Sequence, residues 1–311
     1  MPNNYPLYIA TKTVSDKALT AACDANLPSS ITCGDYAVNT IQPWSQPYFP
    51  GTTDASRLPP IKNAANIGDS LTNAGINWAW YAGGWSNAAG NKNKPGWTNG
   101  NGPSCSDANT IAGAAWPHCP DKLFQFHHQP FNYFANYKEG ADARKQHLRD
   151  EAEFIDAAKN GHLKAVSFVK PIGEENEHPG YASVAAGSKH LVELLQAIDQ
   201  GPQAEDTLVI ITYDEFGGAW DHVPPPGQGN TSGAYDKFGP GTRIPAILVS
   251  RHFDDSSVDH TQYDTTSILA TIERRFDLDP VGGAYGAEGK GRDALVNDFS
   301  DAVRAARMEK K

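Results

Sequence analysis

TLVIITYDEFGGAWDHVPPP, residues Thr207–Pro226, combines a strand-like run with a loop rich in acidic groups. Its first part, Thr207 to Thr212, is rich in β-branched residues, which is typical of a fully buried strand in a parallel sheet. Asp214 and Glu215 follow this strand at once. In open α/β sheets, ligands and catalytic groups collect at the carboxyl ends of the strands, so the stretch predicts a functional site beside a central strand.

A loop rich in acidic groups follows the strand. Gly217 and Gly218 permit positive φ, so the chain can turn back and bring Asp221 and His222 near the two carboxylates. The prolines after Val223 prevent continuation as a helix or central strand. Oxygen ligands with one imidazole suit a divalent cation, and such a cation suits a phosphate oxygen. The alternative is a capped turn with solvated charges.

Helical and strand-like segments alternate along the rest of the chain. Periodicity predicts helices over residues 67–78, 139–160, 182–200 and 265–276, a basic amphipathic end over 298–311, and strands from Ile76 and over 165–169 and 244–249. This alternation predicts an α/β fold with three layers, α/β/α, and a mostly parallel sheet. We expect one domain over residues 1–311, an irregular opening over 1–62, and loop insertions over 84–121 and 227–241.

The composition excludes some classes of partner. The chain has 311 residues with 26 basic and 36 acidic side chains, and so a formal net charge of -10. Nucleic acids and anionic membranes require a basic footprint, so neither is the default partner, whereas a small phosphate ester held by a metal is compatible with this charge. No apolar run reaches the length of a membrane span, so we expect no stable membrane insertion. The opening residues, MPNNYPLYIATK, lack the features of a secretory signal.

The four cysteines form two close pairs in the sequence, Cys23 with Cys33 and Cys105 with Cys119. Each pair lies in a stretch of small and polar residues without the CxxC spacing or paired histidines of a zinc site, which favours two local disulfides. That interpretation implies an oxidising compartment, so we expect a periplasmic or secreted protein. In the alternative, the cysteines are free and the protein is cytosolic, which agrees with the lack of a signal.

Two further groups of polar residues accompany predicted strands or aromatic segments. The run from Glu174 to His178, EENEH, comes directly after the strand over 165–169. His127 and His128 lie in an aromatic setting, FQFHHQPFNYF. A lone histidine is more often structural, but histidines on loops beside carboxylates are better candidates for catalysis.

Cleavage of a phosphoester has three chemical requirements: neutralised charge on the phosphate oxygens, a positioned nucleophile, and an acid for the leaving oxygen. Carboxylates with a metal supply the first, and histidines supply the third. A hydroxyl at a helix N-terminus is the favoured nucleophile, because the helix dipole and free N–H groups stabilise both an alkoxide and a phosphate. The helix that starts at Ile67 is preceded by Asn66 instead.

Several ordered motifs resemble a known family. They are NIGDSLTNAGINWAWYAGGW, VSFVKPIGEENEHPGYASVAAG, YDEFGGAWDHVPPP, and RIPAILVS followed by DHTQYDTTSILATIERRF. Together they resemble the bacterial phosphoesterases that unite acid phosphatases and phospholipases C, a branch of the alkaline phosphatase superfamily, over residues 34 to 280. The WAWYAGGW and HH segments are more similar to the acid phosphatase members, which implies a phosphoric monoester hydrolase.

The resemblance implies a role for each matching residue. Asp214 and Glu215 are then ligands of a divalent metal ion. His127, His128 and His178 surround the phosphate and the leaving group. The remaining two matches, Asp221 and His222, shape the loop that carries the metal ligands.

Two departures from the family pattern bear on the activity. Asn66 stands where members carry a Ser or Thr nucleophile, although its amide can bind metal or a phosphate oxygen. Ser70 or Thr72 would need a shifted register to replace that nucleophile. Members also begin with a strand that ends in a Glu-Asn motif, and no such motif occurs here. We therefore expect a sheet without the family's first strand, in a chain that is either truncated at its N-terminus or a degenerate relative.

Three functions stay open on these grounds. The first is a metal-dependent phosphoric ester hydrolase of the acid phosphatase type, and the second is a phospholipase C that acts on phosphatidylcholine. The third is a remnant that binds phosphate or metal without turnover. The expected partner is a small phosphate ester or a phospholipid headgroup.

Overall fold

The computed structural model describes residues 42–48, 57–97, 124–179, 182–219, 221–223, 225–226, 241–254, 256–281 and 291–307. The chain divides into two compact units. Unit 1 contains the described residues of 65–76 and those from 204 onward, and unit 2 contains those of 42–64 and 77–203. Each unit has its own sheet.

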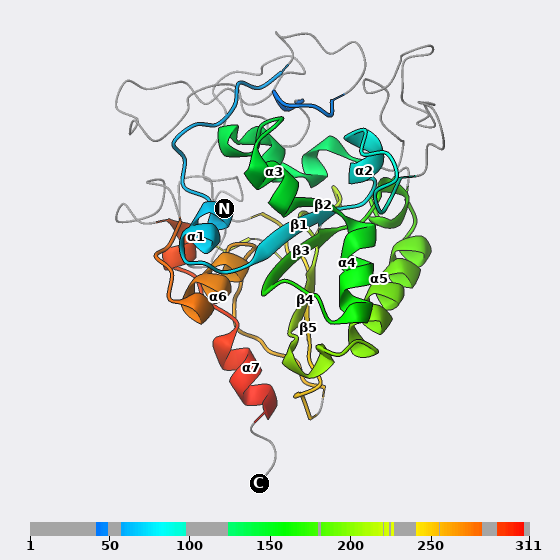
Figure 1. Cartoon of the computed structure of the whole chain (residues 1–311). Helices are drawn as coiled ribbons and strands as arrows, with labels where there is room; N and C mark the ends of the chain where they lie inside the picture. The colour runs from blue at the N-terminus through cyan, green and yellow to red at the C-terminus, as the bar shows by residue number, and fades with distance from the viewer. Residues whose placement is uncertain are drawn as a thin grey trace, which may run out of the picture. The chain divides into compact units, whose positions relative to one another are not determined.

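Unit 2 is built on a parallel sheet of three strands, two of which the sequence predicts (Figure 1). These are β1 (Trp78–Ala82), β2 (Leu148–Asp150) and β3 (Val166–Lys170), in the order β2-β1-β3. The central strand β1 pairs in parallel with both neighbours, so that Trp80 lies opposite Leu148 on one side and Phe168 on the other. The parallel α/β character of the fold is thereby confirmed.

Helices and turns connect and cover these strands. The α-helices of unit 2 are α2 (Trp85–Ala88), α3 (Asp142–His147), α4 (Glu151–Asn160) and α5 (Val184–Asp199). The 3-10 turns are η2 (Phe126–His128), η3 (Pro130–Tyr133), η4 (Ala135–Tyr137) and η5 (Gly173–Glu175). Helices α4 and α5 lie side by side (Figure 1).

Both faces of β1 are covered, because its alternating side chains point to opposite sides of the sheet. Ala79 and Tyr81 pack with Phe154 of α4 and with apolar side chains of α5. On the other face, the Trp78 ring stacks on His147 at 4.3 Å between centroids and packs on Phe131 at 4.8 Å. This burial on two faces explains why β1 reads as a continuous aromatic and apolar run.

Residues 139–160 do not form the single helix that composition predicts. Strand β2 separates α3 from α4. Asp150 ends the strand and caps α4 in a capping box with Glu153, so the new helix starts from its own N-terminal signal. The predicted insertion over 84–121 is also wrong in part, because its described portion contains the buried helix α2.

Unit 1 contains the helices α1 (Ile67–Asn73), α6 (Ser267–Phe276) and α7 (Ser300–Arg307) and the strands β4 (Val209–Thr212) and β5 (Ala246–Val249). It also holds the 3-10 turns η6 (Ala204–Asp206) and η8 (Arg292–Ala294). The prediction that Thr207–Thr212 is a fully buried parallel strand is wrong: β4 pairs antiparallel with β5 and is half-buried. Strand β5 is largely exposed to solvent, and its Ile247 side chain is 54% exposed.

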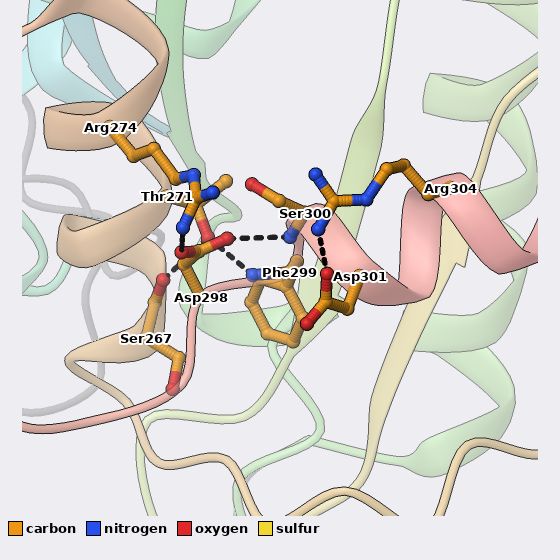
Figure 2. Close-up of polar contacts among 8 residues, drawn as sticks. All are labelled: Ser267, Thr271, Arg274, Asp298, Phe299, Ser300, Asp301 and Arg304. Atoms are coloured by element: carbon orange, nitrogen blue, oxygen red, sulfur yellow. Dashed lines mark hydrogen bonds and ion pairs between the residues drawn. The ribbon is translucent and has the colours of Figure 1, made fainter.

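Polar contacts join α6 to α7 within unit 1 (Figure 2). Asp298 accepts hydrogen bonds from the Ser300 backbone N–H at 2.7 Å and from Arg274 of α6 at 2.9 Å. The Thr271 hydroxyl oxygen accepts from the Phe299 N–H at 3.0 Å. One carboxylate thus accepts from the first N–H of α7 and ties this helix to α6.

Some predictions fall outside the described residues. These are the four cysteines, the opening to residue 41, most of the loop over 227–241, and the last four residues of the chain. Within the described part, no helix combines the length and hydropathy that crossing a bilayer requires.

Candidate functional site

Two loops and the start of α4 leave the sheet of unit 2 at the same edge. Because β1, β2 and β3 are parallel, their carboxyl ends meet there, which is where α/β folds place ligands. Gly83 follows β1, Glu151 follows β2, and the segment from Pro171 to His178 follows β3. Two of the three polar groups that the sequence singles out lie in or against these loops.

The paired histidines contact the loop that follows β3. The His128 side chain is buried, and its Nδ1–H donates to the carbonyl of Pro171 at 3.1 Å. The Trp80 indole of β1 donates to the backbone carbonyl of His128 at 2.5 Å. The His127 ring stands edge-on to His128, with 4.7 Å between centroids. The histidine pair is therefore fixed to the sheet edge through both backbone and side chain.

His178 lies at the end of the same loop and is exposed. Its backbone N–H donates to the Asn176 side chain at 3.0 Å, and its Nδ1–H donates to the Pro179 carbonyl at 2.8 Å. The second bond sets the tautomer, so Nε2 is the ring nitrogen with the lone pair when the ring is neutral. Glu177, just before it, has a φ of 63°, which turns the backbone sharply at this point.

A buried acid–base cluster lies under this loop. His190 of α5 has its Nε2 at 2.7 Å from Glu151 and its Nδ1 at 3.2 Å from Glu175. Burial raises the pKa of Glu151, and the hydrogen bond from His190 only partly offsets this. Burial lowers the pKa of His190, but the hydrogen bond and charge of Glu151, with the charges of Glu175 and Glu193, raise it overall.

The neighbouring carboxylate of Asp150 joins two helix N-termini. It accepts from the Ser86 N–H in α2 at 2.8 Å and from the Ala152 N–H in α4 at 3.0 Å. Burial raises the pKa of Asp150 to about 6, against the effect of these two hydrogen bonds. The role of Asp150 is therefore to connect α2 and α4 at the strand end.

A cavity of about 590 Å³ lies beside α2 and α3. Four basic side chains line it, and three of them have polar partners: Arg149 pairs with Glu153, Lys145 pairs with Asp142, and Arg144 donates to Asn132 and to the backbone. Carboxylates therefore pair with two of the four cations, and neutral acceptors hold Arg144.

The acidic group of the sequence lies in unit 1, at the end of β4. Asp214 and Glu215 are both exposed, and Glu215 accepts from the Gly217 N–H at 2.8 Å. Asp221 accepts two hydrogen bonds from Arg243, at 2.7 and 2.9 Å, which lower its pKa to about 2. His222 lies 3.6 Å from the same carboxylate. Asp221 is thus the ion-pair partner of Arg243, and its role in shaping the loop stays a prediction.

Asn66 is the N-cap of α1 in unit 1. Its Oδ1 accepts from the Asp69 N–H at 2.9 Å, and its Nδ2 donates to the Asp69 carboxylate at 2.8 Å. The two hydroxyls considered as replacements donate to carbonyls of the helix: Ser70 to Asn66 at 3.3 Å and Thr72 to Gly68 at 2.9 Å. Both hydroxyls therefore contribute hydrogen bonds to the helix backbone.

The donor chemistry at the end of β4 fits a hard divalent cation, because two adjacent exposed carboxylates supply oxygen ligands. In the part of the chain that the structure describes, no three His, Cys, Asp or Glu side chains are grouped as a complete metal shell. The predicted metal ligands Asp214, Glu215 and Asn66 belong to unit 1, whereas the predicted phosphate-site residues His127, His128 and His178 belong to unit 2. The convergence of these two sets stays a prediction.

Sequence reasoning missed Glu151 and His190. They lie 39 residues apart and come from different helices, so no motif spacing connects them. The only sequence signal was the position of Glu151 directly after a helix-capping Asp, which marks a strand end.

Comparison with known proteins gives a family match over most of the chain. The sequence model described as "Phosphoesterase family" matches residues 34–279. Non-specific phospholipase C6 of Arabidopsis thaliana is 35% identical over 174 residues, which are 48% of this chain and 32% of that protein. Phospholipase C B of Mycobacterium tuberculosis (strain ATCC 25618 / H37Rv) is 29% identical over 223 residues, 63% of this chain and 42% of that protein. The chain thus spans less than half the length of these curated relatives.

Proposed function

The chain belongs to the phosphoesterase family, and on that basis we propose that it hydrolyses phosphoric ester bonds. The observation that supports this most directly is the hydrogen bond from His128 to the Pro171 carbonyl, which joins the paired histidines to the loop that carries His178. Several imidazoles near the carboxyl ends of parallel strands are what acid catalysis on a phosphate leaving group requires.

We assign the exposed His178 as the acid that protonates the leaving oxygen, and His127 and His128 as contacts of the phosphate. Asp214 and Glu215 would hold a divalent cation, whose charge neutralises the phosphate oxygens. His222 and Asp221, on the same loop, keep those carboxylates in place. Burial of His128 and its bond to Pro171 fix its ring, which favours a positioning contact over free proton exchange.

For the substrate, we propose a phospholipid headgroup ester such as that of phosphatidylcholine. The two relatives described above are named phospholipases C, enzymes that cleave diesters, and this favours a diester over the monoester that the acid phosphatase resemblance implies. Such a substrate agrees with a periplasmic or secreted location, which we also propose from the cysteine pairs.

The test is turnover of phosphatidylcholine vesicles and of p-nitrophenyl phosphate with added divalent metals. We expect release of phosphocholine by the wild-type protein and loss of that release in Asp214→Ala. Faster turnover of the soluble monoester would select the acid phosphatase alternative. Equal rates for the wild type and Asp214→Ala on both substrates would reject hydrolysis at this site.

A specific observation favours one other function, a remnant that binds phosphate or metal without turnover. Asn66 holds the position of the family nucleophile, and a carboxamide cannot accept a phosphoryl group. Calorimetry would then detect phosphate or metal binding while the vesicle assay shows no release. Asn66→Ser should in that case gain activity, because serine restores a hydroxyl and still caps the helix.

A further inference from the structure

His190 lies between the ends of the two strands that flank the central strand. Glu151 follows β2 and Glu175 follows β3, and these strands lie on opposite sides of β1. His190 reaches both from α5, with its two ring nitrogens at 2.7 Å and 3.2 Å from the two carboxylates. Gly83, at the end of β1, leaves the space for this approach, since a Cβ there would lie 3.0 Å from the Glu151 carboxylate.

The geometry defines the charge of the ring. A neutral imidazole has one N–H, so it can donate to one carboxylate only, whereas an imidazolium donates from both nitrogens. The groups that face His190 are all acidic: Glu151 from α4, Glu175 from η5, and Glu193 from its own helix at 3.9 Å. Glu193 is partly neutralised by Lys189, which lies 3.7 Å from it. With Glu151 and Glu175 ionised, an imidazolium is the form of the ring that donates to both carboxylates.

Helix α5 contacts the same loop at a second point. The Ser188 hydroxyl donates to Glu177 at 3.4 Å, and Gly187 packs directly against the Glu177 side chain, where a Cβ would overlap it. Glu175 and Glu177 alternate with Asn176 and immediately precede His178. Helix α5 thus holds Glu175 and Glu177, the neighbours of Asn176, whose side chain accepts from the His178 N–H.

We propose that His190 is a positioning residue: as an imidazolium bound to Glu151 and Glu175 it holds the loop Gly173–Glu177 against α5 and so directs His178, and loss of its proton releases the loop. The catalytic consequence rests on the proposed function, whereas the effect on the loop does not. The raised pKa of His190 is consistent with this charge state, which is present at acidic pH and lost as pH rises through that value.

The loop can be observed without any assay of activity. We expect amide hydrogen exchange in residues 173–178, corrected for intrinsic rates, to be about tenfold faster in His190→Gln than in wild type. Glu175→Gln, at a partly exposed position, should give the same direction of change if His190→Gln fails to fold. His162→Gln changes an exposed histidine of unit 2 and is the matched control. Unchanged exchange in a folded Glu175→Gln protein overturns the proposal.

The kinetic test separates positioning from a general structural effect. Wherever wild type turns over substrate, His190→Gln should lower kcat about tenfold with little change in KM, because a misplaced acid affects the chemical step. His190→Lys keeps a cation and should recover part of kcat and extend activity to higher pH than wild type. Two results would contradict the proposal. One is a change in KM with an unchanged kcat in His190→Gln, and the other is a His190→Lys protein that loses activity at the same alkaline pH as wild type. If wild type has no turnover at all, the proposed hydrolase function fails and the exchange experiment still decides the role of His190.

Discussion

Gly83 allows the loop after β3 and the start of α4 to approach the end of β1. Its N–H donates to the Lys170 carbonyl at 2.9 Å, which continues the pairing of β1 with β3 by one residue. The absence of a side chain lets the backbone of Ile172 pass at close range, where an added Cβ would lie 2.5 Å from the Ile172 nitrogen. Any larger residue must displace the chain that leads to Glu175 and His178.

We therefore expect Gly83→Ala to lower the free energy of unfolding by about 1–3 kcal/mol, since backbone atoms cannot rotate away from the added methyl group. Urea denaturation followed by tryptophan fluorescence measures this difference. Gly241→Ala is the matched control, because nothing lies within 4 Å of a Cβ at that position. Equal stabilities of the two variants would show that the loop after β3 adapts to the methyl group at little cost.

Glu273 of α6 is a buried carboxyl. Burial raises its pKa to about 7, assisted by the neighbouring charge of Asp293 and opposed by a hydrogen bond from the Val281 N–H. A carboxyl with a raised folded-state pKa contributes stability that is fully present below its unfolded pKa of about 4.5 and is lost as pH rises through about 7.

The unfolding temperature should therefore decline between about pH 5 and about pH 8 in wild type, and less steeply in Glu273→Gln, whose amide oxygen can still accept from Val281. Thermal denaturation across this range checks the difference. Glu205→Gln, at an exposed position of the same unit, should follow the wild-type slope. Parallel curves for wild type and Glu273→Gln would contradict a raised pKa of Glu273 in the folded state.

At the scale of elements, the ends of α6 and α7 depend on one side chain. Asp298 caps α7 and pairs with Arg274 (Figure 2). Asp298→Ala should lower the free energy of unfolding by about 1 kcal/mol through loss of the cap, with a smaller contribution from the exposed ion pair. Its control is Asp301→Ala, which removes a surface pair with Arg304 within α7 and should change stability by less than about 0.5 kcal/mol. Chemical denaturation of both variants compares these values.

The sequence predicts most elements correctly where hydrophobic periodicity is strong. Strand β3 and helix α5 lie within two residues of their expected bounds. Prediction fails where a short polar signal competes with helical composition: Asp150 and Glu153 interrupt 139–160 because they form a capping box. It also fails for β4, since a β-branched run gives no information on the direction of its partner strand.

In the candidate site too, some residues could be predicted from the sequence and others could not. His178 could be selected from sequence because it follows a strand, and His127 and His128 because they are paired in an aromatic segment. The structure places the histidine pair against the loop that carries His178. Glu151 and His190 could not, because their contact depends on how α4 packs on α5. A hydrogen bond between distant helices is a property of tertiary packing, and local patterns do not encode it.

At the scale of the whole molecule, metal binding should be visible as added stability. A ligand that binds only the folded state raises the unfolding temperature in proportion to the logarithm of its concentration. We expect divalent cations to raise it in wild type and a chelator to reverse the effect. Asp214→Ala and Glu215→Ala should lose the response, while Asp206→Ala, an exposed acid before β4, should keep it. A response retained by all three variants would place the cation elsewhere.

The order of strands in unit 2 has a consequence for synthesis on the ribosome. β1 occupies the middle of the sheet, yet it emerges before either neighbour and must wait for Leu148 and Phe168 to be translated before it can pair. Until then its tryptophans and tyrosine remain uncovered on the nascent polypeptide, a state that invites chaperone capture or self-association. Slower translation between Ala82 and Leu148 should therefore lower the yield of native protein. On overexpression, the insoluble fraction should grow when translation of this segment is slowed.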